Sequence, residues 1–267
     1  MIRTPLGVGL PGYLRLLALK DYPRAFHVHG TTVTLGISSA LELWRGETYE
    51  TKEPETLDWI DGFASEDVFF DVGANIGLYS LYAARARGCR VFAFEPEGKN
   101  FARLLHNQKL NELADMRAYC VAVGGSLRCD ELHVAGATAG DSQHNIGEDN
   151  PLFPRECTNI QGSVVASLDD LCFSLGLPVP QHLKIDVDGL EEEIVAGAPR
   201  LLAHPALRTV MIEVTELRGR RSPIHARMDR AGLVPLEMAS RAYETDALVA
   251  RNMLFGRSSR VSEATGV

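Results

Sequence analysis

Four acidic residues stand directly after short apolar segments of the chain, where their side chains could do chemistry. In chain order they are Asp71, Glu95, Asp186 and Glu213. Short apolar runs are typical of buried parallel strands, whose carboxyl ends meet at one edge of a sheet. We therefore expect the four carboxylates to face one crevice, as partners for hydroxyl groups, an amine or a divalent cation.

A glycine-containing turn follows the first of these acids. It reads Asp71-Val72-Gly73-Ala74-Asn75-Ile76-Gly77 and leads into a helical pattern. Gly73 permits a tight turn, Asn75 tolerates a left-handed backbone, and Gly77 lets the helix pack closely. The free N–H groups at the start of a helix suit a carboxylate, and Asp71 suits an amine. A ligand with an amino-acid end, such as the methionine part of S-adenosylmethionine, matches both.

Glu95 ends the next apolar run and is followed by Pro96. An acid in this place accepts hydrogen bonds from ribose hydroxyl groups. Apolar residues in the third predicted strand are candidates for contact with an adenine: Val121, Ala122 and Val123. The rival cofactor is NAD, whose sites carry the pattern GxGxxG. Here Asn75 replaces the second glycine and Leu78 the last, so a pyrophosphate-binding turn is less well supported.

The segment from Lys184 to Asp186 is unusual because it places a lysine inside a predicted central strand. Lys184 and Asp186 share one face of that strand, and a buried ammonium needs a partner such as Asp186 or Glu213. Three interpretations stay open. The residues form a structural ion pair, or one carboxylate acts as general base on an acceptor hydroxyl, or Asp186 and Glu213 bind a divalent cation such as Mg²⁺.

Three histidines are candidates for chemistry, but each also has a simpler interpretation as a surface residue. The irregular stretch 133–162 is a candidate lid over the acceptor, with His144 as a candidate base or metal ligand. A polar surface loop is the simpler interpretation of this stretch. His27 and His29 alternate on a predicted hairpin and are interpreted as surface residues.

Strands and helices alternate along the chain, which indicates a mostly parallel sheet. We predict strands at 68–70, 91–94, 119–123, 183–185, 209–212 and 253–255, and helices at 54–63, 78–87, 168–175, 191–202 and 222–232, with another ending near 110. Residues 1–52 form a predicted N-terminal extension, with an arm and a hairpin. Residues 53–267 form the predicted cofactor-binding domain.

The composition limits the class of protein. The chain has 267 residues and a net charge of -8, which disfavours non-specific binding to nucleic acid. The cysteine count is odd and no CxxC pair occurs, which favours reduced thiols in the cytoplasm. No apolar run reaches transmembrane length, so we expect no membrane partner. The sequence leaves a homo-oligomer open.

Several motifs in this order resemble the FkbM family of methyltransferases. They are DVGANIGLYS from Asp71, FEP from Phe94, Asn107 with Asn111, LDDL from Leu168 and LKIDVDGLE from Leu183. The resemblance implies a class I methyltransferase fold of the α/β, Rossmann-like kind. Its mostly parallel seven-stranded sheet would carry helices on both faces, after a small N-terminal extension of strands and helices. It implies S-adenosylmethionine as cofactor, held by Asp71, Gly73, Ala74, Asn75, Gly77, Glu95, Pro96, Ala122 and Asp186.

The resemblance further implies O-methylation of a hydroxyl on a sugar, a polyketide or a related small metabolite. By this interpretation the candidate catalytic residues are Lys184, Asp186 and Glu213. Two other classes stay open: a catalytically silent binding module that keeps the cofactor fold, and an NAD-linked oxidoreductase. Binding of S-adenosylhomocysteine without binding of NAD is the observation that separates them.

Overall fold

A computed structural model describes residues 21–257, apart from 136, 137, 143, 147–156, 188, 219, 241 and 247. Residues 1–20, which include most of the predicted N-terminal arm, lie outside the described residues. So does 147–156, in the middle of the predicted lid. None of the described helices has the length and apolar character needed to cross a membrane.

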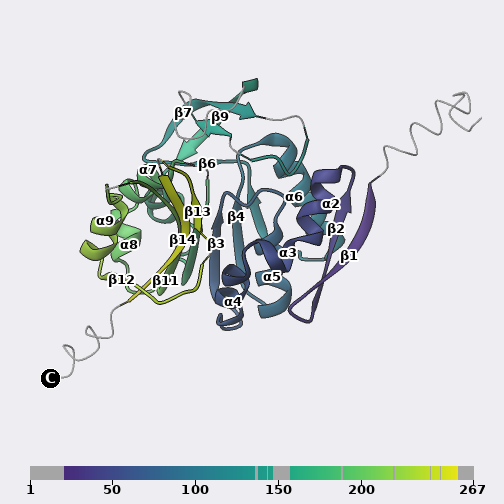
Figure 1. Cartoon of the computed structure of the whole chain (residues 1–267), viewed down its shortest axis with the longest axis horizontal. Coiled ribbons are helices and arrows are strands. Elements are labelled where there is room, and N and C mark those ends of the chain that lie inside the picture. Colours follow the sequence, from purple (N-terminus) through teal and green to yellow (C-terminus); the bar gives the residue numbers. More distant parts are fainter. Residues whose placement is uncertain are drawn as a thin grey trace, which may run out of the picture.

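The centre of the molecule is a large, mostly parallel sheet (Figure 1). Its strands lie in the order β12-β14-β11-β10-β3-β4-β5, and β13 pairs with β14. The strand order turns round between β3 and β10, so ligands are expected at the carboxyl ends there. The bounds are β3 Val68–Val72, β4 Arg90–Phe94, β5 Arg117–Tyr119, β10 His182–Ile185, β11 Thr209–Leu217, β12 Leu233–Pro235, β13 Ala242–Glu244 and β14 Leu248–Arg257.

Helices cover both faces of this sheet, because successive strand residues point to opposite sides. In β3, Phe69 packs into one apolar core and Phe70 into the other. The first face carries α4 (Pro54–Asp61), α5 (Leu78–Arg87) and α6 (Gly98–Leu110). The second carries the π-helical turn η1 (Asp170–Ser174), α7 (Glu191–Ala196), α8 (Pro199–Ala203) and α9 (Ile224–Arg230). The predicted α/β fold of the class I methyltransferases is therefore confirmed, although the large sheet has eight strands and not the seven predicted.

A second, smaller sheet lies above the carboxyl edge (Figure 1). Its strands are β6 (Ala122–Val123), β9 (Cys157–Ala166), β7 (Arg128–Ala135) and β8 (Asn145–Ile146), in that order. The single strand predicted at 119–123 is wrong, since the chain leaves the large sheet after Tyr119 and enters the small one at Ala122. The stretch 133–162, predicted to be irregular, includes parts of β7 and β9 and the strand β8, and its described residues 138–142 form a loop.

Two predicted boundaries differ from the structure. The helix predicted at 191–202 is broken, because Gly197 lies against the backbone of Gly125, where a side chain has no room, and Pro199 begins α8. The strand predicted to end at Ile212 continues to Leu217 through its pairing with β14. Glu213 therefore lies within β11 and does not follow it.

The N-terminal elements pack against the first face of the sheet. They are β1 (Tyr22–Val28) and β2 (Thr31–Ile37), which form the predicted hairpin, and then α2 (Ala40–Glu47) and α3 (Tyr49–Lys52). Two asparagines of the motif, Asn107 in α6 and Asn111 at its end, bind this hairpin. Asn107 accepts the N–H of Gly36 at 2.9 Å, and Asn111 accepts the N–H of Thr34 at 2.8 Å. The domain boundary at residue 52 stays a prediction.

Candidate active site

Glu95, Asp186 and the glycine turn after Asp71 meet at the carboxyl edge of the sheet, beside the strand reversal. Hydrogen bonds that continue the sheet align them. The N–H of Gly73 donates to Phe94 O at 3.0 Å, that of Glu95 to Tyr119 O at 3.1 Å, and that of Asp186 to Val72 O at 3.1 Å. The ends of β3, β4 and β10 therefore stand side by side.

A pocket with about 550 Å³ of space between its lining atoms, part of it open to solvent, lies at this edge. We call it the edge pocket. Six predicted cofactor residues line it: Gly73, Asn75, Glu95, Pro96, Ala122 and Asp186. Val123 also lines it, as expected for an adenine contact, whereas Val121 is not among the lining residues. Its upper wall comes from the small sheet and the loop before β8: Leu132, Ser142, His144 and Ile146.

The loop that carries Ser142 is fastened over the pocket by hydrogen bonds from three elements. Asp141 O accepts the side-chain amides of Asn75 at 2.8 Å and Asn100 at 3.1 Å. Gly140 donates its N–H to the Asn100 side chain at 2.7 Å, and its carbonyl accepts Arg45 Nε at 2.6 Å. This loop fits the predicted lid, and the asparagine of the glycine turn helps to hold it.

Glu95 is buried at the base of the edge pocket and is 4% exposed. Its two carboxylate oxygens accept the backbone N–H of Asn75 at 2.7 Å and of Glu97 at 2.9 Å. Burial raises the pKa of Glu95 to about 7, although these two N–H groups oppose the shift. A buried carboxylate in a pocket stabilises ligands that donate hydroxyl groups.

The glycine turn has the backbone that its sequence predicts. Gly73, Asn75 and Gly77 all adopt positive φ, of 82°, 53° and 94°. A Cβ on Gly73 would lie 1.8 Å from the carbonyl oxygen of Asp186, so this glycine lets β3 and β10 approach closely. At Gly77 a Cβ would meet the Leu104 side chain of α6 at 2.3 Å. Both glycines are needed for close packing within the protein, and Gly73 also lines the edge pocket.

The buried lysine of β10 makes an ion pair beneath the pocket. Lys184 Nζ lies 2.6 Å from Asp186 Oδ2 and 4.9 Å from the centre of the Tyr79 ring. Burial opposes the charge of Lys184, but Asp186, Glu53 and Asp71 outweigh it and raise its pKa. Burial likewise opposes the charge of Asp186, but Lys184 and then Lys52 hold its pKa below the usual range. Asp186 therefore stays ionised at neutral pH.

Five predicted site residues do not line the edge pocket: Asp71, Ala74, Gly77, Lys184 and Glu213. Asp71 is buried, accepts the Ser80 hydroxyl at 2.6 Å, and lies opposite Lys184 in the strand register. Burial raises its pKa, and Lys184 and Ser80 partly offset that rise. The role of Asp71 toward a cofactor amine stays a prediction.

Sequence reasoning did not single out Glu191 and Glu53, which shape the site. Glu191 accepts the N–H groups of Val187 and Gly189, both at 3.1 Å, and so holds the loop after β10. Its place in the LKIDVDGLE motif was the available signal. Glu53 contributes to the charge balance of Lys184 from the start of α4, and no local pattern connects these two positions.

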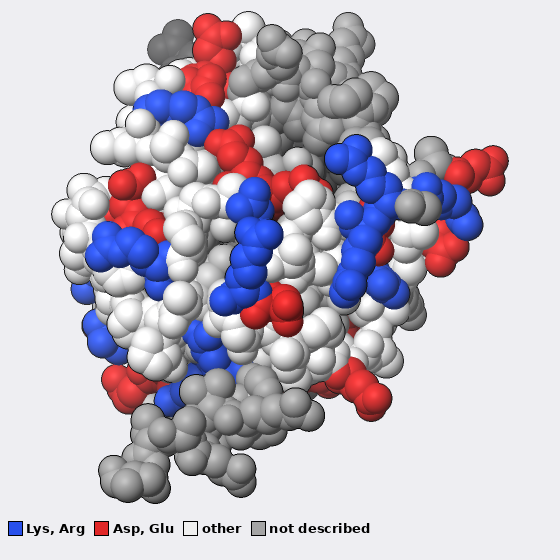
Figure 2. Space-filling view, turned by 90° about the vertical axis from the view of Figure 1, so that its left-hand side faces the viewer, with Lys and Arg blue, Asp and Glu red and all other residues white. Residues whose placement is uncertain are grey.

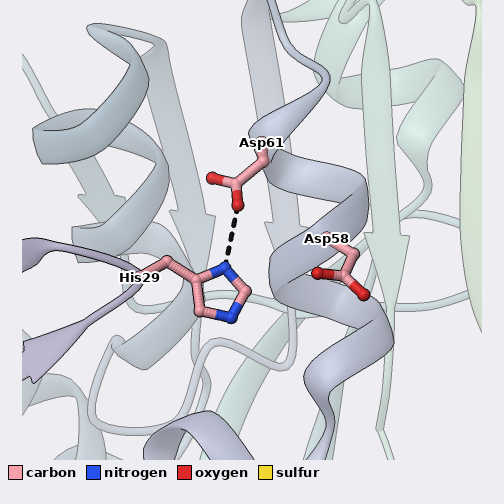
Figure 3. Close-up of side chains that lie close together, drawn as sticks. All are labelled: His29, Asp58 and Asp61. Carbon is pink, nitrogen blue, oxygen red and sulfur yellow. Dashed lines mark hydrogen bonds and ion pairs between the residues drawn. The ribbon is translucent and has the colours of Figure 1, made fainter.

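One group of side chains that could together ligate a metal ion lies outside the edge pocket (Figure 3). His29 at the hairpin turn and Asp58 and Asp61 on α4 have ligand atoms within 4.8 Å of one another. His29 Nδ1 is 2.8 Å from Asp61 Oδ2. His29 is exposed, which agrees with its interpretation as a surface residue. Among the described residues, Asp186 and Glu213 belong to no such set of three.

Comparison with known proteins identifies the family. Residues 71–239, more than half of the chain, match the model of the "Methyltransferase FkbM domain". The chain belongs to the FkbM methyltransferase family. The match begins at Asp71 and covers the glycine turn, Glu95 and Asp186, so the edge pocket is the pocket of an FkbM methyltransferase domain. Family membership supports S-adenosylmethionine as the methyl donor.

Two curated relatives are also methyltransferases by name. "Hexuronic acid methyltransferase AglP" of Haloferax volcanii is 24% identical over 194 residues, which cover 72% of this chain and 74% of the relative. "31-O-demethyl-FK506 methyltransferase FkbM" of Streptomyces tacrolimicus is 28% identical over 176 residues, which cover 57% and 67%.

Solved structures give a looser likeness. The precorrin-6y C5,15-methyltransferase of Geobacter metallireducens has a TM-score of 0.45 at 14% identity, with 80% of this chain and 89% of that chain covered. TYW2 of P. horikoshii in complex with MeSAdo has a TM-score of 0.46 at 15% identity, with 93% and 82% covered. The fold assignment rests on the sheet order and on the family match.

The pKa of Glu95 gives this FkbM methyltransferase a testable pH dependence. In the predicted role of Glu95, ribose hydroxyl groups would donate to the ionised carboxylate, so binding would favour loss of the Glu95 proton. Because its pKa is about 7 in the free protein, we expect affinity for S-adenosylhomocysteine to rise with pH through about 7 and then level off. Calorimetric titrations across this range measure the effect. A Glu95→Gln variant should show no such rise, and a flat profile in the unaltered protein would contradict the assignment.

Proposed function

We propose that this chain transfers the methyl group of S-adenosylmethionine to a hydroxyl of a sugar-like or polyketide-like metabolite. The observation that carries the proposal is the edge pocket, in which Glu95 and Asp186 line one space across the strand reversal. Glu95 would hold the ribose hydroxyls, and Ala122 and Val123 would contact the adenine. The sulfonium end would then lie toward the end of β10, where Asp186 is partly exposed.

Hydroxyl acceptors are favoured by the chemistry of Asp186 and by the names of the relatives. An ionised carboxylate accepts the hydrogen bond of an acceptor hydroxyl, orients its oxygen, and takes up the proton as the oxygen attacks the methyl carbon. Methyl transfer needs a near-linear attack, so alignment supplies much of the rate. The two curated relatives are named for a hexuronic acid and for a 31-O-demethyl compound. Both names fit acceptors that carry hydroxyl groups.

The direct test is an acceptor screen with S-adenosylmethionine labelled in its methyl group. Matched pairs of sugars, in which an amino group replaces one hydroxyl, distinguish O-methylation from N-methylation. We expect label in a methyl ether, together with one S-adenosylhomocysteine for each product formed. Label only in the amino members of the pairs would overturn the proposal for oxygen acceptors.

Lys184 acts in this scheme as a positioning residue, because it touches Asp186 and keeps that carboxylate ionised. Replacing Lys184 with methionine removes the nearest charge that lowers the pKa of Asp186. We expect the acid limb of the kcat profile to move to higher pH by about 1–2 units, with little change in affinity for S-adenosylhomocysteine. A Lys109→Met variant in the last turn of α6 is the control. An unmoved acid limb would count against Asp186 as the group that titrates.

The same assay decides between a base and a metal at Asp186. The Asp186 carboxylate is already paired with Lys184 at 2.6 Å, and Glu213 does not line the edge pocket. We therefore propose that Asp186 acts directly on the acceptor. Activity should then survive treatment with a chelator, and activity lost to the chelator and restored by Mg²⁺ would favour Asp186 and Glu213 as metal ligands. The catalytic role of Glu213 stays a prediction.

A further inference from the structure

Parts of β11, β13 and β14 form a ribbon that extends beyond the carboxyl edge of the sheet, next to the edge pocket. Pairing between β10 and β11 ends at Ile185 and Ile212. Beyond that point β11 continues to Leu217 against β14, and β13 pairs with the same part of β14. This ribbon and the segment that follows β11 flank the side of the site on which an acceptor would approach the end of β10.

Two hollows lie along this ribbon, and the first adjoins the segment after β10 that also lines the edge pocket. Val187 and Leu190 line the edge pocket, while Gly189 and Glu191 of the same segment line the first hollow, which has about 760 Å³ of space open to solvent. The first hollow shares Leu217, Arg220 and Arg221 with the second, a wider hollow of about 1370 Å³. We call the two together the arginine groove.

Arginines and glutamates line the arginine groove in equal number, and its glutamates are Glu191, Glu192, Glu216 and Glu244. Its arginines are Arg218, Arg220, Arg221 and Arg251. Figure 2, which views the side of the molecule that carries α8 and α9, shows basic and acidic side chains intermixed on that face.

The four glutamates of the groove already have partners. Glu191 accepts the N–H groups of Val187 and Gly189. Glu216 accepts Ser222 N and His225 Nε2, both at 3.1 Å. Glu192 accepts the Ser222 hydroxyl at 2.8 Å.

Glu244 lies 3.4 Å from Arg218. Within the described part of the chain, the side chains of Arg220, Arg221 and Arg251 make no hydrogen bond or ion pair. All three are exposed.

Three unpaired guanidinium groups along one groove fit an anionic ligand. A guanidinium presents N–H donors in a planar fork that matches the oxygens of a carboxylate or a phosphate. We infer that the arginine groove binds an oxyanion group of the methyl acceptor, a carboxylate or a phosphate, while a hydroxyl of the same acceptor lies at Asp186. This inference rests on the proposed function, since it assigns the class of acceptor.

The test compares three sugars on protein saturated with S-adenosylhomocysteine. Glucuronate carries a carboxylate, glucose 1-phosphate carries a phosphate, and glucose is the neutral control. We expect at least one anionic sugar to bind about tenfold or more tightly than glucose. The two anionic arms show which oxyanion the groove prefers. Equal binding of all three sugars would overturn the inference.

Variants test whether the arginine groove causes the preference for an anionic sugar. A double variant, Arg220→Gln with Arg221→Gln, should lose the preference for the anionic sugar and keep its affinity for S-adenosylhomocysteine. Arg230→Gln on α9 is the matched control, because Arg230 is exposed and does not line the groove. Equal loss in the control would overturn the inference, and so would an RNA oligonucleotide that displaces the sugars through Arg220 and Arg221. If the unaltered protein fails to bind S-adenosylhomocysteine, the proposed function itself has failed.

Discussion

Replacing Glu95 with alanine is expected to lower the affinity for S-adenosylhomocysteine by at least about a hundredfold. A hydrogen bond to a charged group contributes about 1.5–3 kcal/mol, and a ribose offers two hydroxyl groups to this carboxylate. Glu95 is the buried acid at the base of the edge pocket. Calorimetric titration measures the loss directly.

The fold of the variant needs its own measurement, because the Glu95 side chain also accepts the N–H groups of Asn75 and Glu97. Thermal unfolding reports whether the glycine turn survives. Glu95→Gln keeps the size of the side chain and serves if the alanine variant does not fold. Glu131→Ala, in which an exposed glutamate of the small sheet is changed, should bind as the unaltered protein does. Affinity within twofold in a folded Glu95→Ala protein would contradict the assignment.

Replacing Gly73 with alanine is expected to destabilise the protein by about 2–5 kcal/mol. A left-handed backbone costs a residue with a Cβ about 1–2 kcal/mol, and forcing extra atoms into a packed site costs about 1–3 kcal/mol more. Both costs apply here, because φ is 82° and the new Cβ would lie 1.8 Å from Asp186 O. That oxygen is backbone, so it moves only if β10 moves with it.

Urea unfolding measures the free-energy change at Gly73, and Gly162→Ala provides the matched control. Gly162 lies in β9 and has no positive φ, and a Cβ added there would meet no described atom within 4 Å. Its change should be below about 1 kcal/mol. The Gly73 variant should also bind S-adenosylhomocysteine less well if it folds. Equal stability of the two alanine variants would show that β3 and β10 do not approach as described.

The sequence could predict the parallel sheet and one side of the site because both depend on local patterns. A short apolar run followed by an acid marks a buried strand and its carboxyl end, and this is how β3, β4 and β10 place Gly73, Glu95 and Asp186. The left-handed Asn75 likewise follows from residue type. These features need no knowledge of distant contacts.

The small sheet could not be predicted in the same way. β7 carries charged residues such as Arg128, Asp130 and Glu131, and only its later part packs into the pocket wall. β9 is exposed at Ile160 and Val164 and finds its partner across a long stretch of chain. Weak alternation and distant pairing leave little local signal. Consequently Leu132 and Ile146 were not singled out as residues of the pocket wall.

The end of β11 could not be predicted from the local sequence either. Its apolar run ends at Ile212, where β10 ends, but β14 continues to pair with it on the other side. Strand length here depends on a partner that follows much later in the chain. For the same reason Glu213 lies inside a strand, and the ribbon of the arginine groove has no signal in the local sequence.

The most direct test of the cofactor assignment is a pair of calorimetric titrations on the unaltered protein, one with S-adenosylhomocysteine and one with NAD. We expect S-adenosylhomocysteine to bind at one site per chain and NAD to give no binding heat. Binding of NAD without binding of S-adenosylhomocysteine would contradict the claim that the edge pocket holds an adenosyl amino acid.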